Sequence, residues 1–355
     1  MRVLQILGSL HRGGAETMVM NYYRAFDKSL CQMDFVIHKE FDNDYRAEAM
    51  SYGAKIILLD RPGEVGAPKY INQLSRAIKE NGPYDAAHIH TNYQAFLAIL
   101  AAKKAGIKKI FVHSHNTVFP KKYLPVNRLA MLLCGVRRIG CGEVAGKAFF
   151  GKRKFTVVNN AIDVSKFRNA HNTDYAEVKK QRFGDRVVMG HLGRFHSQKN
   201  HVFLVELMKK IVSENKNIVL ALYGEGDREQ EIRELVQKEG LGDNILFMGT
   251  TNDAVTAYKT FDIFVLPSLY EGFPVTLVEA QLSGLRTLAS NKISRECDLR
   301  LGLIEFLPLD TYVWADKIKN LLERDAPSAM PILDEVIDEY DVNIQWKKLY
   351  EIYKK

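Results

Sequence analysis

The chain has 355 residues, of which 46% are hydrophobic, which is enough for two domains with cores of their own. No stretch reaches 18 apolar residues, and the first apolar run, Val3–Leu7, is too short for a signal-peptide core. We therefore expect a cytoplasmic protein without a membrane-spanning helix. The four cysteines show no Cys-x-x-Cys spacing, which favours free thiols over a metal site or disulfides.

The net charge of +8 comes from one segment of the chain. Residues 101–170 hold 15 Lys or Arg and two acidic residues, or +13, whereas residues 1–100 are neutral and residues 171–355 carry −5. Such a basic patch attracts an anionic membrane, nucleic acid or a phosphorylated acceptor.

The first half of the chain alternates short apolar strands with helices, as in a parallel α/β domain. We predict strands at 3–7, 35–38, 55–59, 84–90, 110–116, 136–142 and 155–158. Gly13 and Gly14 follow the first strand and open a helix. Glycines there let the backbone approach a ligand, and the start of a helix favours phosphate.

Two of these strands end in histidines, His88 with His90 and His113 with His115. In a parallel sheet the carboxyl ends of the strands line the ligand crevice. The alternation lets one histidine of each pair face each side of the sheet. No nearby Asp, Glu or Cys completes a metal set, so we expect no zinc.

Two further segments of the first half allow more than one interpretation. Asp42-Asn-Asp44 has the Asp-x-Asp pattern of some metal sites, but no apolar strand leads directly into it, so we interpret it as a solvated loop. Residues 118–138 are both basic and apolar. They are either an amphipathic, acceptor-side or membrane-facing helix, or an ordinary basic surface over a core helix.

The strand–helix plan restarts after a polar segment, residues 165–185, which we take as a linker. We predict strands at 187–192, 218–223, 245–248, 261–266 and 286–289, then helices with a Pro-marked break near 327–331 and a last helix at 346–353. Arg194 and Lys199 lie on the loop after the first of these strands. Two cations at that place can neutralise a leaving diphosphate.

Two carboxylates flank a loop-to-helix junction after strand 261–266. Glu271 lies in the loop and Glu279 lies in the helix that Pro274 opens and Gly284 closes. The backbone N–H groups of Gly272–Val275, of which Pro274 has none, form an anion site, because the first amides of a helix have no partner within it. This pattern suits a sugar nucleotide: amides for phosphate, one Glu for the hexose and one Glu for the ribose.

These motifs resemble those of the retaining nucleotide-sugar glycosyltransferases of family 4, of the bacterial exopolysaccharide and capsule type. The most specific run is Pro-Ser-x-x-Glu-Gly-x-Pro followed by Glu-Ala-x-x-x-Gly, which contains Glu-x7-Glu. Weaker matches occur in order along the chain: Gly-Gly-Ala-Glu at 13–16, His-Asn at 115–116, Asn-Asn-Ala-Ile-Asp at 159–163, Gly-Arg-x4-Lys-Asn at 193–200 and Gly-Glu-Gly at 224–226.

The resemblance implies the GT-B fold, α/β with two doubly wound Rossmann-like domains facing across a cleft. Residues 1–168, with a last helix at about 345–355 that crosses back, would form the acceptor-side domain, and residues 169–344 the donor-binding domain. The enzyme would move a hexose from a nucleotide-sugar, most simply a UDP-sugar, with retention and without a cofactor or bound metal.

The family's motifs also assign roles to individual residues. The implied catalytic residues are His115, Glu271, Arg194 and Lys199. The implied donor-binding residues are Gly13, Gly14, Arg194, Lys199, Gly224, Gly249, Glu271, Gly272, Phe273, Pro274, Val275 and Glu279.

The basic segment suggests the acceptor. We expect a lipid-linked glycan at the anionic inner face of the plasma membrane, in cell-surface polysaccharide assembly, and no nucleic acid. A sugar-nucleotide 2-epimerase of the same fold and a basic nucleic-acid-binding protein remain as alternatives. A dinucleotide dehydrogenase does not fit, because Gly8–Gly14 lacks the Gly-x-Gly-x-x-Gly spacing.

Overall fold

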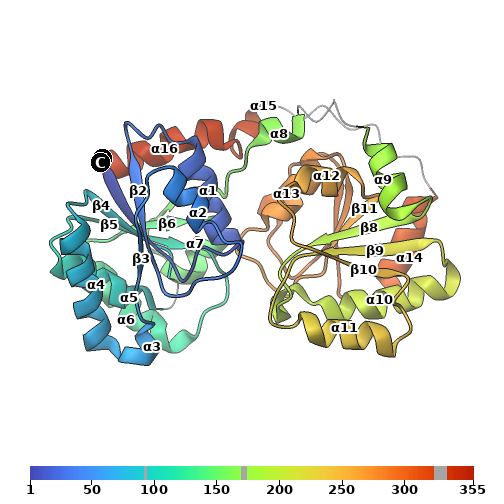
Figure 1. Ribbon diagram of the computed structural model, residues 1–355, viewed down its shortest axis with the longest axis horizontal. Coiled ribbons are helices and arrows are strands. Elements are labelled where there is room, and N and C mark those ends of the chain that lie inside the picture. Colours follow the sequence, from blue (N-terminus) through green and yellow to red (C-terminus); the bar gives the residue numbers. More distant parts are fainter. Residues whose placement is uncertain (92–93, 169–173, 324–333) are drawn as a thin grey trace. The chain divides into compact units, whose positions relative to one another are not determined.

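The structure, a computed structural model, describes residues 1–91, 94–168, 174–323 and 334–355. It divides into two compact units (Figure 1). The first comprises residues 1–163 and 337–355, and the second comprises residues 164–336. The sequence-based division had placed these two limits at 168 and about 345.

The first unit is built on a seven-stranded parallel sheet in the order β3-β2-β1-β4-β5-β6-β7. Its strands are β1 (Arg2–Ile6), β2 (Gln32–Ile37), β3 (Ile56–Leu58), β4 (Ala86–Ile89), β5 (Lys109–Ser114), β6 (Arg137–Gly140) and β7 (Thr156–Val157). The chain winds outward from β1 to β3 and then returns to β4. The order of the strands therefore reverses between β1 and β4, where ligands bind in doubly wound folds.

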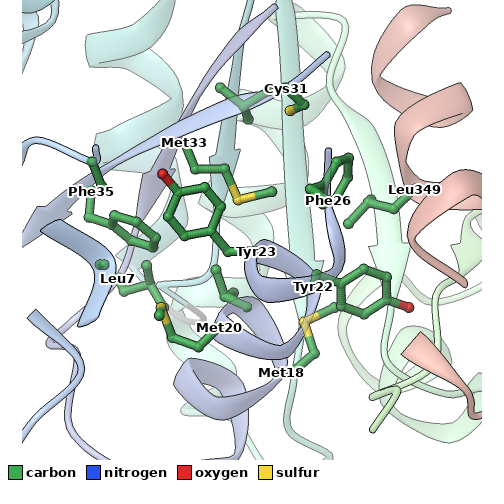
Figure 2. Packing of buried hydrophobic residues seen from close by; sticks show 14 of the residues in the cluster. Leu7, Met18, Met20, Tyr22, Tyr23, Phe26, Cys31, Met33, Phe35 and Leu349 are labelled. Carbon is green, nitrogen blue, oxygen red and sulfur yellow. The ribbon is translucent and has the colours of Figure 1, made fainter. Parts of the chain in front are cut away.

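Helices cover both faces of this sheet. They are α1 (Gly14–Ala25), α2 (Arg46–Ser51), α3 (Pro62–Val65), α4 (Ala67–Asn81), α5 (Ala95–Lys104), α6 (Leu124–Leu133), α7 (Glu143–Phe150) and α16 (Val342–Lys354). One buried apolar cluster joins α1 and α16 to the sheet, and a second lies under α4, α5, α6 and α7. Figure 2 shows part of the first cluster, in which Tyr22 of α1 and Phe26, just after α1, lie beside Leu349 of α16.

The last helix, α16, belongs to the first unit, although the residues of the second unit separate it from the rest of the first unit in the sequence. The preceding helix is α15 (Asp334–Asp338), and Asp341 pairs with Ile162 in an isolated parallel bridge. Leu349 and Tyr353 are buried, and the ring of Trp346 lies 5.5 Å from that of Phe26. The apolar face of α16 thus completes the core around α1.

The second unit is built on a six-stranded parallel sheet in the order β10-β9-β8-β11-β12-β13. Its strands are β8 (Val187–Leu192), β9 (Ile218–Tyr223), β10 (Ile245–Gly249), β11 (Ile263–Leu266), β12 (Arg286–Ser290) and β13 (Ile304–Leu307). Its helices are α8 (Val164–Arg168), α9 (Tyr175–Phe183), α10 (His201–Glu214), α11 (Glu229–Lys238), α12 (Ala254–Lys259), α13 (Val275–Leu282) and α14 (Thr311–Leu322). Helices α10, α11 and α14 cover one face and α12 and α13 the other (Figure 1). The strand order reverses between β8 and β11.

Three sequence-based expectations need correction. The segment taken as a linker holds α8 and α9, and the segment after β12 contains the edge strand β13 rather than helices alone. In the loop taken as solvated, Asp42 is exposed, but the Asp44 side chain is only 3% exposed and pairs with Arg46 at 2.8 Å. Asp44 therefore orders the start of α2. The Pro-marked break at 327–331 lies outside the described residues.

Candidate nucleotide-sugar site

Lys199 and Glu271 form an ion pair where the strand order of the second sheet reverses. Lys199 ends the turn after β8 and Glu271 lies in the loop after β11, and their Nζ and Oε1 atoms are 2.7 Å apart. Both side chains are largely buried, with exposed fractions of 17% and 9%. Lys199, which is predicted to bind the diphosphate, and Glu271, which is predicted to bind the hexose, are therefore direct partners. Since an ammonium has three donors, Lys199 keeps two for a ligand.

Backbone and side-chain hydrogen bonds tie these two loops together. Gln198 donates through Nε2 to Glu271 Oε2 at 2.9 Å, and its carbonyl accepts from the amide of Leu269 at 2.8 Å. Asn200 has φ of 57°, a left-handed conformation that Asn tolerates, and donates to the Pro267 carbonyl. These hydrogen bonds fix the two loops relative to each other, and the loops in turn hold Lys199 and Glu271 together.

Gly224 is explained by the packing of neighbouring loops. Its φ is 141°, and a Cβ at this position would lie 2.3 Å from the Gly193 carbonyl oxygen. Its amide donates to the carbonyl of Gly249 at 2.8 Å, and Gly249 itself has φ of 68°. These glycines let the loops after β8, β9 and β10 approach closely. Arg194 lies on the first of these loops and is exposed.

Helix α13 begins as the sequence indicates. Pro274 occupies its N-cap position, Gly272 and Phe273 just before it are buried, and Val275 is its first residue. Gly284 follows its C-terminus with φ of 79°. The first-turn amides of α13 therefore lie beside Glu271, and they have no partner within the helix. Such a helix start is suited to a phosphate group.

Glu279 lies one turn further into α13 and is paired with a tyrosine. Tyr258 on α12 donates its hydroxyl to Glu279 Oε2 at 2.8 Å. Burial raises the pKa of Glu279 to about 7, and the Tyr258 hydrogen bond opposes this only in part. The residue as a whole is only partly buried. A carboxylate with such a pKa is half protonated near neutral pH.

In the first unit, Gly13 and Gly14 differ in their surroundings. Gly13 is the N-cap of α1, and a Cβ there would lie 2.5 Å from the Glu16 carboxylate. A Cβ at Gly14 would meet no atom within 4 Å. A side chain at Gly13 would displace the end of the Glu16 side chain, whereas Gly14 has open space beside it.

The four histidines of β4 and β5 lie on one face of the first sheet. In the register of these parallel strands, His88 pairs with Phe111 and Ile89 with Val112, which brings His90 beside His113. The expectation that each pair splits across the sheet is therefore wrong, because residues two apart on a strand share a face. His115 lies just after β5, and its Nε2 is 2.8 Å from His90 Nδ1.

His88, His90 and His113 each place a ring nitrogen within 4.8 Å of the others, which makes them a candidate metal cluster. The rings of His88 and His113, however, are stacked with an interplanar angle of 5°. A metal lies in the plane of each imidazole that binds it, so coordination here requires the rings to rotate. The geometry favours a stack of neutral rings, since burial lowers the pKa of His88 to about 3.

Sequence analysis missed three residues that support the predicted site residues. Gln198 and Tyr258 bind the two carboxylates of the second unit. In the first unit Gln5 binds His90, which in turn binds His115. Gln198 lies inside the Gly-Arg-x4-Lys motif, so its place on the loop was visible. Tyr258 and Gln5 come from distant segments, and no local pattern marks them.

Comparisons with known proteins identify the family of the chain. Residues 12–166 match the model of the family "Glycosyltransferase Family 4", and residues 174–299 match "Glycosyl transferases group 1". The chain is 37% identical over 343 residues to the putative glycosyltransferase EpsF of Bacillus subtilis, which covers 92% of this chain and 89% of that protein.

Two further similarities are more distant. An Escherichia coli UDP-Gal:alpha-D-GlcNAc-diphosphoundecaprenol alpha-1,3-galactosyltransferase is 25% identical over 76% of this chain and 75% of its own. The crystal structure of Anabaena HepE in complex with UDP and glucose superposes with a TM-score of 0.83, at 17% identity and over 100% of both chains. At that identity the likeness concerns the fold alone, which is GT-B.

Proposed function

The chain belongs to the glycosyltransferases of family 4 and group 1, and from this membership we propose that it transfers a hexose from a UDP-sugar to a lipid-linked glycan with retention of configuration. The pathway we propose is the assembly of a cell-surface polysaccharide. A UDP-bound structural neighbour supports the choice of nucleotide, and a relative named for a diphosphoundecaprenol substrate supports the choice of acceptor.

The observation that carries this proposal is the Lys199–Glu271 pair beside the start of α13. It places a cation, a carboxylate and helix amides together at the point where the strand order reverses, where doubly wound folds bind ligands. Cation and amides suit a diphosphate, and the carboxylate suits sugar hydroxyls. The same loop adds the exposed Arg194.

Transfer breaks the bond between the anomeric carbon and the diphosphate oxygen, whose electron pair passes to the diphosphate, and forms a bond from that carbon to an acceptor hydroxyl oxygen. The hydroxyl proton passes to the leaving diphosphate. Lys199, Arg194 and the first amides of α13 would stabilise this developing charge. Glu271 and His115 would orient the hexose, and Glu279 would bind the ribose. These groups meet the charge without a metal ion, so we propose that transfer persists in excess chelator.

Helix α6 supports the proposed membrane-bound acceptor. Its buried face is fixed by Asn127, which accepts from the amide of Phe96 and donates to the carbonyl of Tyr123. Its other face exposes four apolar side chains: Val126, Leu129, Leu132 and Leu133. Among the described residues no helix is both long and apolar enough to cross a membrane. We therefore propose that α6 rests on the anionic inner leaflet of the plasma membrane.

The experiment that tests the proposed function is a thermal-shift panel of nucleotides and nucleotide-sugars, followed by turnover with the sugar that binds. We expect UDP-sugars to raise the melting temperature. Lys199→Ala should weaken UDP binding and lower turnover about 100- to 1000-fold, as for loss of one charged transition-state contact.

The matched control is Lys209→Ala. Lys209 also pairs with a glutamate, Glu239 at 2.6 Å, but its side chain is exposed and lies on α10. It should retain wild-type binding and turnover. Equal turnover in Lys199→Ala and wild type would contradict the proposed role of Lys199. Release of UDP in the absence of any acceptor, with a changed sugar as product, would favour a 2-epimerase instead.

A further inference from the structure

A line of five buried side chains runs through the first unit from His115 to His88. His115 Nε2 lies 2.8 Å from His90 Nδ1, and His90 Nε2 lies 2.9 Å from Gln5 Oε1. Gln5 Nε2 lies 3.2 Å from the Tyr353 hydroxyl, which lies 2.6 Å from His88 Nδ1. The line therefore connects β1, β4 and α16 with the residue that follows β5.

The chemistry of Gln5 gives this line a direction. Its amide oxygen can only accept, so His90 Nε2 carries a proton and His90 Nδ1 accepts one from His115. At its other end, the Gln5 amide group donates to Tyr353. The tyrosine hydroxyl then has its own proton to donate to His88. All bonds point the same way, and each fixes the proton position in the next group.

His115 is left with one unused nitrogen. Its Nε2–H donates to His90, so Nδ1 carries a lone pair, and this buried atom has no hydrogen-bond partner in the described part of the chain. A buried acceptor without a partner is unfavourable, so a bound hydroxyl that donates to it would stabilise it. Burial also lowers the pKa values of His90 and His115, so both rings are neutral at pH 7.

We propose that Gln5 and Tyr353 act through His90 as positioning residues, which hold His115 in its Nε2–H tautomer so that Nδ1 accepts a hydrogen bond from a hydroxyl of the donor hexose. This inference rests on the proposed function, which places His115 at the donor. It gives the last helix of the chain a part in catalysis besides its part in packing, because Tyr353 lies on α16.

The tautomer can be measured without any substrate. Long-range proton–nitrogen spectra of the full chain labelled with 15N-histidine distinguish the two neutral forms, and His115→Ala identifies the His115 signals. We expect the Nε2–H form in the wild type. Gln5→Met, which has no acceptor, should shift His115 towards the other tautomer. Gln5→Glu keeps an acceptor oxygen and should restore the wild-type form.

Kinetics provide the second readout. Gln5→Met and Tyr353→Phe should lower kcat roughly 10- to 100-fold, as for loss of a supporting partner behind a ligand-binding histidine, with little change in the donor KM. The control is Tyr70→Phe, which removes a buried tyrosine–histidine bond of the same unit, to His38 at 2.8 Å, outside this line. It should leave kcat and the His115 signals unchanged.

The two proposals fail in different ways. An active transferase in which Gln5→Met and Tyr353→Phe keep the wild-type tautomer and kcat would overturn the positioning role alone. A loss of kcat that Tyr70→Phe reproduces would reduce the effect to general destabilisation and would also overturn it. If the tautomer responds as expected but no UDP-sugar binds or turns over, the proposed function fails, and the hexose contact fails with it.

Discussion

At the scale of single residues, the ion pair between Lys199 and Glu271 changes how each should respond to mutation. Their charges are largely buried and only 2.7 Å apart, so removing one leaves the other without its partner. We expect Lys199→Met and Glu271→Gln to be non-additive in the free energy of unfolding, with a coupling of about 1–3 kcal/mol in a double-mutant cycle. Chemical denaturation of the four proteins measures it.

The exposed pair Lys209–Glu239 is the control for that cycle. Lys209 is 64% exposed, and solvent screens such pairs, so its coupling should stay below about 1 kcal/mol. Additive effects at Lys199 and Glu271 would show that the pair is not formed in solution.

On activity, Glu271→Ala should reduce hexose transfer more than the binding of bare UDP, because only the hexose is assigned to Glu271.

Glu279 predicts a pH dependence for nucleoside binding. Burial raises its pKa to about 7, so the carboxylate that would accept from ribose hydroxyls is lost as the pH falls through 7. Affinity for uridine, which carries no phosphate to titrate, should fall by up to about tenfold per pH unit below that value. Glu279→Gln should bind uridine weakly and without this dependence. Titration calorimetry from pH 5.5 to 8.5 measures both.

The raised pKa of Glu279 also makes the free energy of unfolding depend on pH. The pKa of Glu279 is higher in the folded protein than its ordinary value of 4.5, so the folded state holds the proton more tightly. The stability that Glu279 contributes is therefore present below about pH 4.5 and is lost as the pH rises through 7.

A uridine affinity that is flat between pH 6 and 8 in the wild type would contradict the ribose assignment.

At the scale of elements, the sequence predicted what local patterns encode. Buried parallel strands such as 218–223 are continuous apolar runs between polar residues, and Pro274 and Gly284 mark the two ends of α13. Strand β13 was missed because it is a short edge strand with only partly buried side chains. Helix α9 was taken as linker because it buries only Phe183, although Asp174 caps its first turn by accepting from Glu177.

The site contacts were harder to predict than the elements. The facing of the histidines depends on the register between β4 and β5, which no local pattern gives. Likewise, the pairing of Lys199 with Glu271 depends on β8 and β11 being neighbours, although 72 positions separate the two residues. Motifs named the residues, and only the topology showed which of them touch.

Helix α16 should be a structural part of the first unit. Leu349 is 2% exposed and packs in the cluster that contains α1, so Leu349→Ala should lower the free energy of unfolding of that unit by about 2–5 kcal/mol. Ile344→Ala, on the same helix at a residue that is 42% exposed, should cost well under 1 kcal/mol.

The two tryptophans allow this effect to be followed unit by unit. Trp346 lies in the first unit and Trp314 in the core of the second. In a Trp314→Phe background the fluorescence reports on α16, and in a Trp346→Phe background it reports on the second unit. Leu349→Ala should shift the first transition and leave the second in place. A shift of both, or of neither, would mean that α16 does not stabilise the first unit in the way its packing indicates.

At the scale of the whole molecule, charge and exposed apolar surface coincide in one segment. Residues 101–170 carry the entire positive excess, and α6 lies within them. Lys121, Lys122 and Arg137 flank this helix and are exposed, as are Leu129, Leu132 and Leu133. Helix α6 therefore buries one face against the core and presents an apolar face to the outside, and its membrane-facing or acceptor-side role stays a prediction.

That combination predicts binding to anionic bilayers. Each Lys or Arg near such a surface contributes about 1 kcal/mol, and the three leucines can enter the headgroup region. The chain should co-sediment with vesicles of phosphatidylcholine that contain phosphatidylglycerol at low salt. Binding should weaken at high salt, where the screening length shortens, and on phosphatidylcholine alone.

A pair of variants distinguishes membrane binding by α6 from nonspecific adsorption through exposed apolar side chains. Leu132 and Leu133 are 62% and 72% exposed, so Leu132→Ser with Leu133→Ser should fold normally and lose most of the binding. Met50→Ser changes a side chain on α2 that is 54% exposed and should bind like the wild type. Binding that ignores lipid charge, or no binding even at low salt, would remove the membrane proposal. The transferase proposal would stand, because it depends on the second unit's Lys199, Glu271 and α13 and not on α6.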